Sequence, residues 1–123
     1  WIGSTRPDGR PHAMPVWGVW VDGALYFSTD PGSRKGRNLA TNPETVIHLE
    51  SGDEVVILEG RVTSVTDATL LQKADAAYHS KYQVHLTGEE APAGVVYQLR
   101  PRAAFAWMES TFPTSATRWK FDL

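Results

Sequence analysis

The sequence predicts a mainly β protein, a sandwich or a closed barrel, with about seven strands and two short helices. Turn signals recur at short intervals between β-rich runs, and the Asp22-Gly23 pair is typical of a hairpin. Both helix patterns stand between strands, without the regular alternation of β-α-β units. The pattern therefore favours an antiparallel sheet over a doubly wound parallel one.

Three strands in an antiparallel meander are expected at the N-terminal end. A turn at Pro7-Asp8-Gly9 separates the first strand from the second, and Asp22-Gly23 separates the second from the third. Pro15 cannot donate a hydrogen bond to a sheet, so the chain is irregular there or lies at an edge. The expected strands are Trp1–Arg6, Pro11–Val21 and Ala24–Thr29.

The rest of the chain combines two helices with further strands. Ser33 can cap a helix that Pro43 stops, and Asp67 can cap a second helix whose apolar residues recur at helical spacing. Gly60 marks a bulge or a bend at a barrel corner. The polar segment Gln83–Gly94 is expected to be a loop that acts as a lid or an oligomer contact. The helices span about Ser33–Thr41 and Ala68–Lys81, and the strands are Thr45–Glu50, Glu54–Val65, Val95–Leu99 and Ala103–Met108 (interrupted at Arg100-Pro101) and Thr117–Phe121.

Composition fits one soluble globular domain over residues 1–123, with 41% hydrophobic and 21% charged residues. The net charge of −2 argues against a nucleic-acid binder. The absence of cysteine excludes disulfides, thiolate metal sites and a cysteine nucleophile, and is compatible with the cytoplasm. No apolar run approaches the roughly 20 residues of a membrane span. Because Trp1 already stands in a strand pattern, we expect an N-terminal element to be missing.

The helix start at Ser33 is the most informative segment for function. A helix N-terminus presents free N–H groups and a partial positive charge, and here it carries added cations. The alternative is a solvated basic helix, but cations oppose the dipole there, so the arrangement favours a bound anion. The predicted phosphate-binding residues are Ser33, Arg34, Lys35 and Asn38, with the hydroxyls of Ser28 and Thr29.

Two further stretches can contact a flat ligand. The irregularity at Pro15 leaves backbone groups of Met14, Val16 and Trp17 available to the polar edge of a ring system, although the tryptophans of this stretch can equally fill the core. Near the C-terminal end, Trp107 and Arg118 can stack on a conjugated ring or fill the sheet. The four histidines lack metal spacing, and no metal site or catalytic residue is assigned.

In this order, these segments resemble the pyridoxamine 5′-phosphate oxidase-like superfamily of flavin and deazaflavin oxidoreductases. The first half of the chain carries the resemblance strongly and the rest loosely. The resemblance implies a six-stranded split β-barrel with flanking helices, and a homodimer with a cofactor in each of two interface clefts. The segments that carry it are Pro15-Val16-Trp17, Asp22-Gly23, Leu25-Tyr26-Phe27-Ser28-Thr29, Ser33-Arg34-Lys35 and Asn38-Leu39 with Asn42-Pro43.

The same resemblance implies roles for the residues that match. Arg34 and Lys35 correspond to the phosphate-binding Arg-Lys pair, with Ser28 and Thr29 beside it. The stretch Met14–Trp17, which includes Pro15, corresponds to the strand under the ring. Trp107 and Arg118 correspond to residues that reach the cofactor from the partner subunit.

The chain departs from true pyridoxamine phosphate oxidases at its C-terminal end. Their Arg-Leu-His-Asp-Arg-like segment grips pyridoxal phosphate, whereas this chain has Arg118-Trp119-Lys120-Phe121-Asp122, so vitamin B6 oxidation is not predicted. The Arg37-Asn38-Leu39 continuation and the Trp17–Trp20 strand are more similar to the deazaflavin branch. The expected activity is hydride transfer between deazaflavin F-420, or next FMN, and a small conjugated substrate. The alternative is a non-catalytic carrier or sensor of flavin or haem.

Overall fold

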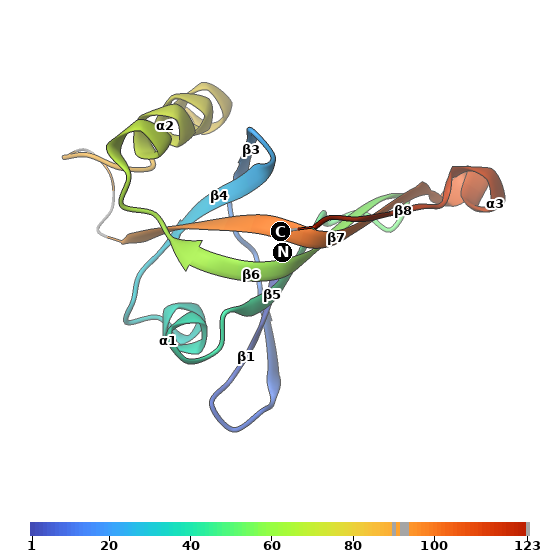
Figure 1. Ribbon diagram of the computed structural model, residues 1–123, viewed down its shortest axis with the longest axis horizontal. Coiled ribbons are helices and arrows are strands. Elements are labelled where there is room, and N and C mark those ends of the chain that lie inside the picture. The colour runs from blue at the N-terminus through green and yellow to red at the C-terminus, as the bar shows by residue number, and fades with distance from the viewer. Residues whose placement is uncertain (90, 92–93, 123) are drawn as a thin grey trace.

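An eight-stranded antiparallel sheet forms the body of the protein in the computed structural model, which describes residues 1–89, 91 and 94–122 (Figure 1). Across the sheet the order is β2-β1-β5-β6-β7-β4-β3, and β8 pairs with the second half of β7. The strands are β1 (Ile2–Thr5), β2 (Pro11–Met14), β3 (Val19–Val21), β4 (Ala24–Thr29), β5 (Glu44–His48), β6 (Glu54–Ser64), β7 (Val95–Met108) and β8 (Thr117–Lys120). The helices are α1 (Arg34–Thr41), α2 (Ala68–Tyr82), the 3-10 turn η1 (Glu109–Thr111) and α3 (Phe112–Ser115).

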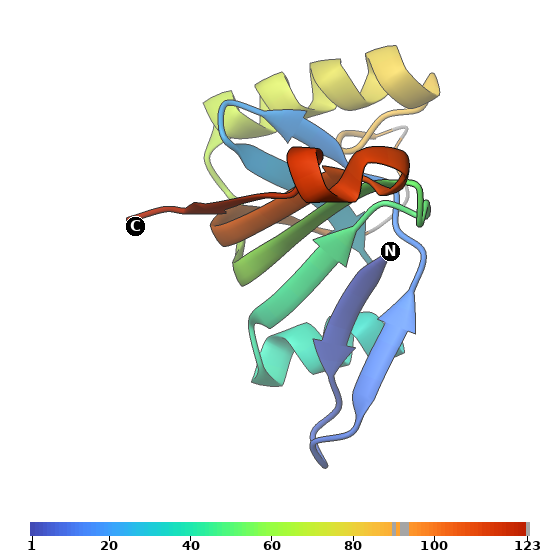
Figure 2. The same cartoon turned by 90° about the vertical axis from the view of Figure 1, so that its right-hand side faces the viewer.

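The sheet curls on itself so that strands distant in its order share one core (Figure 2). Ile2 on β1 and Phe27 on β4 are buried in the same cluster as Leu99 on β7, together with Leu39 from α1. A curled antiparallel sheet of this kind, with helices on its outside, is a split β-barrel. The predicted mainly β fold class is therefore confirmed.

A second core lies between the sheet and α2, which covers β3 and β4 on the side opposite to α1 (Figure 1). Tyr26 and Ala24 point into this core, while Phe27 points into the barrel, because successive strand residues face opposite sides. Leu86, which follows α2, is also buried here. Its backbone N–H donates to the Asp75 carboxylate at 2.7 Å, so the segment after α2 is tied back onto the helix.

The expected N-terminal meander is wrong in one respect. β1 pairs with β2 and β3 pairs with β4, but β2 and β3 lie at opposite edges of the sheet. Residues 15–18 carry the chain from one edge to the other. The irregularity expected at Pro15 is therefore real, and it divides the predicted Pro11–Val21 strand in two because proline cannot continue the ladder.

The predicted interruption at Arg100-Pro101 is also wrong, since β7 runs without a break through both residues. Its register with β6 shifts between Glu59 and Gly60, and Pro101 pairs with Gly60. This bulge confirms the prediction for Gly60. A Cβ at Gly60 would lie 2.8 Å from the carbonyl oxygen of Arg100, so only glycine lets the two strands approach so closely at the bend.

The helix caps follow the sequence signals closely. The Asp67 carboxylate accepts the backbone N–H of Leu70 at 3.0 Å, and α1 starts directly after Ser33. The short α3 was not predicted, because four residues are too few to show helical periodicity. The predicted loop Gln83–Gly94 includes residues 90, 92 and 93, which lie outside the described residues, so its expected role as a lid or oligomer contact stays a prediction.

Candidate functional site

The turn between β4 and α1 builds the centre of the candidate site. The Ser33 backbone N–H and hydroxyl both donate to the carbonyl oxygen of Asp30, at 3.0 and 2.6 Å. The same hydroxyl oxygen accepts the N–H of Gly36 at 3.0 Å, which makes Ser33 the N-cap of α1. The Thr29 hydroxyl at the end of β4 lies 3.4 Å from it. The contacts of Ser33 therefore hold the end of β4 and the start of α1 together.

Gly36 allows this turn to be tight. A Cβ at Gly36 would lie 2.8 Å from the Cα of Pro31, which is a backbone atom and cannot swing away. The first turn of α1 therefore packs directly on the preceding turn. This close approach aims the N-terminus of α1 at the end of β4, where its unpaired N–H groups can meet a ligand.

A pocket of about 330 Å³ opens at this point, and we call it the basic pocket. Four elements contribute to it: β2, the end of β4, the turn and the start of α1. Six of the twelve predicted cofactor-binding residues line it together. Its lining residues are His12, Met14, Ser28, Thr29, Asp30, Ser33, Arg34 and Lys35.

The basic pocket has the electrostatics of an anion site. The first turn of α1 carries no acidic residue, and within the described part of the chain neither Arg34 nor Lys35 forms an ion pair. Burial lowers the pKa of Lys35, since a partly desolvated ammonium without an anionic partner is unfavourable. The one carboxylate in the lining, Asp30, accepts the backbone N–H of Gly32 at 2.8 Å. The pocket therefore offers two cations, the hydroxyls of Ser28 and Thr29 and helix N–H groups to a ligand.

His12 is a lining residue that the sequence analysis did not assign. Burial, and then the charges of Arg6, Arg34 and Lys35, lower the pKa of its imidazole. Strand alternation places His12 and Met14 on one face of β2, which is the signal that could have included it.

Asn38 lies elsewhere than expected. Its side chain is fully buried, and its amide nitrogen donates to the Ser4 hydroxyl at 3.1 Å, which ties α1 to β1. Position 38 is one turn beyond the helix start and faces the core rather than the basic pocket. The structure therefore gives Asn38 a structural contact and no place among the pocket residues.

The stretch expected beneath a ring system leads away from the basic pocket. Pro15 is exposed in the crossing between β2 and β3, and Trp17 is 57% exposed, with its ring stacked on Tyr82 at 4.6 Å between centroids. The Tyr82 hydroxyl donates to the carbonyl oxygen of Gly18 at 2.9 Å, so α2 holds this crossing in place. Val16 lines a second, larger cavity.

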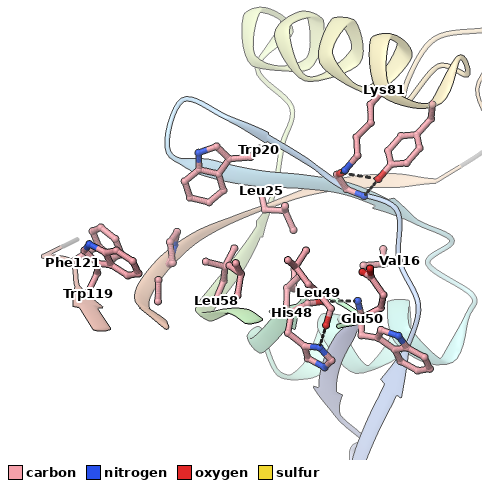
Figure 3. A pocket seen from close by; sticks show the side chains of 17 residues that line it. Val16, Trp20, Leu25, His48, Leu49, Glu50, Leu58, Lys81, Trp119 and Phe121 are labelled. Atoms are coloured by element: carbon pink, nitrogen blue, oxygen red, sulfur yellow. Dashed lines mark hydrogen bonds between the residues drawn. The ribbon is translucent and has the colours of Figure 1, made fainter. Parts of the chain in front are cut away.

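This second cavity, the aromatic cavity, has a volume of about 620 Å³ and lies along the open side of the barrel (Figure 3). Trp20 on β3 and Trp119 on β8 stand on its walls, and Lys81 of α2 donates to the carbonyl oxygen of Gly18 at its rim, at 3.0 Å. The sequence analysis did not predict it, because its residues come from separate segments. They are Trp1, Val16, Gly18, Trp20, Leu25, Ile47, His48, Leu49, Glu50, Val56, Leu58, Lys81, Tyr82, Pro101, Ala104, Trp119 and Phe121.

Trp107 and Arg118 do not reach the basic pocket of their own chain. The indole N–H of Trp107 donates to the Glu109 carboxylate at 3.2 Å, and its ring meets Phe112 edge to face. Arg118 is exposed on β8. Trp107 belongs to the last part of β7 and Arg118 to β8, and these strands lead to α3, whereas α1 lies below the barrel (Figure 1).

Metal-ligand clusters and membrane-spanning helices are both absent from the part of the chain that the structure describes. No group of three or more histidine and acidic side chains there is arranged to hold a metal ion. None of the described helices has the length and apolar character to cross a membrane.

The sequence belongs to a known family. Residues 1–108 match the family model of pyridoxamine 5′-phosphate oxidase, so the chain is a member of this family. No curated protein matches the sequence significantly.

Solved structures share the fold at low sequence identity. A conserved hypothetical protein from Mycobacterium tuberculosis aligns with a TM-score of 0.72 and 24% identity, over 87% of this chain and 74% of the other. A protein named F-420 reductase aligns with a TM-score of 0.64 and 22% identity, over 84% of this chain and 85% of the other. A heme binding protein from Mycobacterium smegmatis aligns at 0.71 and 19%, over 97% of this chain and 51% of the other. These similarities support the split-barrel fold.

Proposed function

We propose that the protein binds a flavin-type cofactor in the basic pocket and transfers hydride between it and a small conjugated substrate. Deazaflavin F-420 is the favoured cofactor and FMN the next. The convergence of Arg34, Lys35 and three hydroxyl groups on one pocket at the start of α1 carries this proposal. Membership of the pyridoxamine 5′-phosphate oxidase family supports it, and the fold shared with a protein named F-420 reductase supports the choice of cofactor.

The residues of the pocket fit the phosphate of such a cofactor. Lys35 is partly desolvated, no described residue supplies it with a counter-ion, and a phosphate would do so. The hydroxyls of Ser28 and Thr29 add neutral donors, and the N–H groups at the start of α1 add more. FMN and F-420 both carry a tricyclic ring, a ribityl chain and a phosphate, so both suit the same pocket.

The chain itself contributes binding, orientation and exclusion of water. Met14 stands at the edge of the basic pocket and Val16 at the edge of the aromatic cavity, so the crossing between them connects the two. We place the ring along this crossing and the apolar part of the substrate in the aromatic cavity. When bound, the cofactor supplies two-electron hydride chemistry, and no side chain is assigned as an acid or base.

We also propose that two copies of the chain form the working unit. Large apolar side chains surround the aromatic cavity and are 42–53% exposed: Trp1, Trp20, Trp119 and Phe121. A monomeric protein rarely leaves so many aromatic residues together in water. In a homodimer, Trp107 and Arg118 would approach the cofactor of the partner subunit, since they do not reach the pocket of their own chain.

Parallel titration with FMN and F-420, followed by fluorescence, tests the cofactor proposal. Replacing Arg34 and Lys35 by alanine should weaken binding by about 1.5–3 kcal/mol for each charge-assisted bond that is lost. Arg37→Ala is the matched control, because Arg37 is a cation of the same helix that does not line the pocket. Equal affinity of wild type and the Arg34→Ala, Lys35→Ala double variant would reject the assignment.

The second candidate is a non-catalytic carrier or sensor of flavin or haem. It is favoured by His48, which lies on the wall of the aromatic cavity (Figure 3). The His48 Nδ1 atom lies 2.6 Å from the carbonyl oxygen of Leu49, which can only accept, so in the neutral imidazole Nδ1 carries the proton and Nε2 the lone pair. An exposed imidazole at the edge of a cavity with aromatic walls presents Nε2 as the nitrogen that could bind haem iron.

Two measurements separate the candidates. Oxidation of reduced FMN or F-420 by a panel of quinones and enones, followed by absorbance, supports the enzyme. A haem Soret band that His48→Ala shifts or abolishes, with no consumption of reduced cofactor by any acceptor, supports the carrier.

A further inference from the structure

His12 stands in the basic pocket with an incomplete set of hydrogen bonds. It lies on β2 opposite Ser4 of β1, and it lines the pocket together with Arg34 and Lys35. Its Nδ1 atom is buried, and no described residue offers that atom a hydrogen-bond partner. Nε2 is therefore the ring nitrogen that can meet a ligand.

The charges around His12 oppose its protonation. Its pKa is lowered by burial and then by three nearby cations, so the imidazole is neutral near pH 7 when no anion is present. Asp30 is the carboxylate in the same pocket, and its side chain is already engaged with Gly32. The titratable and charged groups on the side of the basic pocket are Arg6 after β1, Asp30 from the turn, and Arg34 and Lys35 from α1. His12 also lines a further pocket, whose titratable and charged residues are Glu44 and His48 of β5, Glu59 of β6 and Arg102 of β7.

We infer that His12 is a proton-linked anion-binding residue, which takes up a proton from solvent when a tetrahedral dianion binds beside Arg34 and Lys35. The imidazolium Nε2–H then donates to an oxygen of the anion. Protonation also places an N–H on the buried Nδ1, for which no described residue is an acceptor, so the attraction of the dianion has to exceed this cost. This inference rests on the proposed function of the pocket, and it adds a third cationic group to it. The two negative charges of the ligand offset the cations that keep His12 neutral in the empty pocket.

The sign of the pH dependence follows from linkage. If the bound anion raises the pKa of His12, affinity is higher when His12 is protonated. The gain is complete below the lowered pKa of the empty pocket, and it is lost as the pH rises through the pKa of the complex. A ligand phosphate titrates near pH 6 and changes its own charge, whereas sulfate keeps two charges throughout, so sulfate isolates the contribution of His12.

Proton NMR of the histidine Cε1–H signals tests the inference. The signals are followed from about pH 5 to about pH 8 in sulfate and in chloride of matched ionic strength. His12→Gln identifies the His12 signal, and His79→Gln is the control, because His79 lies on α2 outside the basic pocket. Sulfate should raise the His12 pKa by at least about one pH unit, which corresponds to roughly tenfold tighter binding at low pH. His12→Gln should abolish the pH dependence of sulfate affinity.

The outcomes distinguish this inference from the proposed function. If Arg34→Ala and Lys35→Ala abolish FMN binding while the His12 signal titrates identically in sulfate and chloride, the inference about His12 is wrong and the cofactor site remains. If FMN affinity does not depend on Arg34 and Lys35, the assignment of the basic pocket as the cofactor site is wrong. A His12 shift that disappears in Lys35→Ala supports both.

Discussion

At the scale of single residues, burial decides which polar side chains serve a ligand and which serve the fold. Lys35 and Asn38 stand on the same short helix, three positions apart. Lys35 lines the basic pocket, whereas Asn38 is fully buried and donates to Ser4 at 3.1 Å. Sequence reasoning grouped them because both are polar and close to the helix start. It could not tell which face of α1 the barrel would cover.

Asn38→Ala should destabilise the protein and leave cofactor affinity unchanged. The substitution leaves the Ser4 hydroxyl without its donor in the core, which costs about 1–3 kcal/mol. Chemical denaturation measures this loss, and FMN titration of the folded protein measures affinity. Arg37→Ala, on the exposed side of α1, should change stability by less than about 0.5 kcal/mol. A variant of normal stability with weakened FMN binding would restore Asn38 as a ligand of the cofactor.

At the scale of elements, the join between β4 and α1 depends on backbone contact more than on helix propensity. Ser33 caps the helix, donates its hydroxyl to the carbonyl oxygen of Asp30, and lies 3.4 Å from the Thr29 hydroxyl. Gly36 lets the first turn of the helix rest on the Asp30-Pro31 backbone. The same contact aims the helix N-terminus at the pocket, so the geometry of the site depends on one glycine.

Gly36→Ala tests this dependence, because two effects of opposite sign compete. Alanine favours a helix interior over glycine by about 1 kcal/mol. The new Cβ would lie 2.8 Å from the Cα of Pro31, and such overpacking typically costs about 1–3 kcal/mol. We expect a net loss of thermal stability together with weaker FMN binding.

Gly52→Ala is the matched control for this variant. In the described structure a Cβ at Gly52 meets no atom within 4 Å, so stability should change by less than about 0.5 kcal/mol. An increase in the melting temperature of Gly36→Ala would contradict the close packing of α1 on the turn.

At the scale of the whole molecule, the curled sheet leaves one side of the barrel open. The aromatic cavity lies there, and exposed tryptophan side chains from β3 and β8 surround it (Figure 3). These residues are far apart in the sequence. They meet because β8 pairs directly with β7, while β3 is joined to β7 through β4. This is the surface on which we expect the second copy of the chain.

Trp119→Glu should convert a dimer into a monomer. Trp119 is 44% exposed beside the aromatic cavity, and a charge placed in an apolar interface is strongly unfavourable. Light scattering after gel filtration measures the mass. Ala76→Glu is the control, since it adds the same charge at an exposed position of α2 that does not line the cavity. A wild-type protein that runs as a monomer would contradict the dimer, as would a Trp119→Glu variant that remains dimeric.

The sequence by itself predicted the elements whose signals are local. Ser33 and Asp67 as caps, the Asp22-Gly23 hairpin and the bulge at Gly60 are all confirmed, because each depends on the chemistry of a few neighbouring residues. The grouping of Ser28, Thr29, Ser33, Arg34 and Lys35 was also accessible, since these residues lie within eight positions of one another.

Only the tertiary structure decided what depends on the path of the chain through space. In the folded chain β2 and β3 lie at opposite edges of the sheet, and Asn38 faces the core. His12 lines the basic pocket, and residues of six strands and one helix line the aromatic cavity. The physical reason is that caps and turns are satisfied by neighbours in the sequence. Burial and cavities depend instead on which distant surfaces the curled sheet brings together.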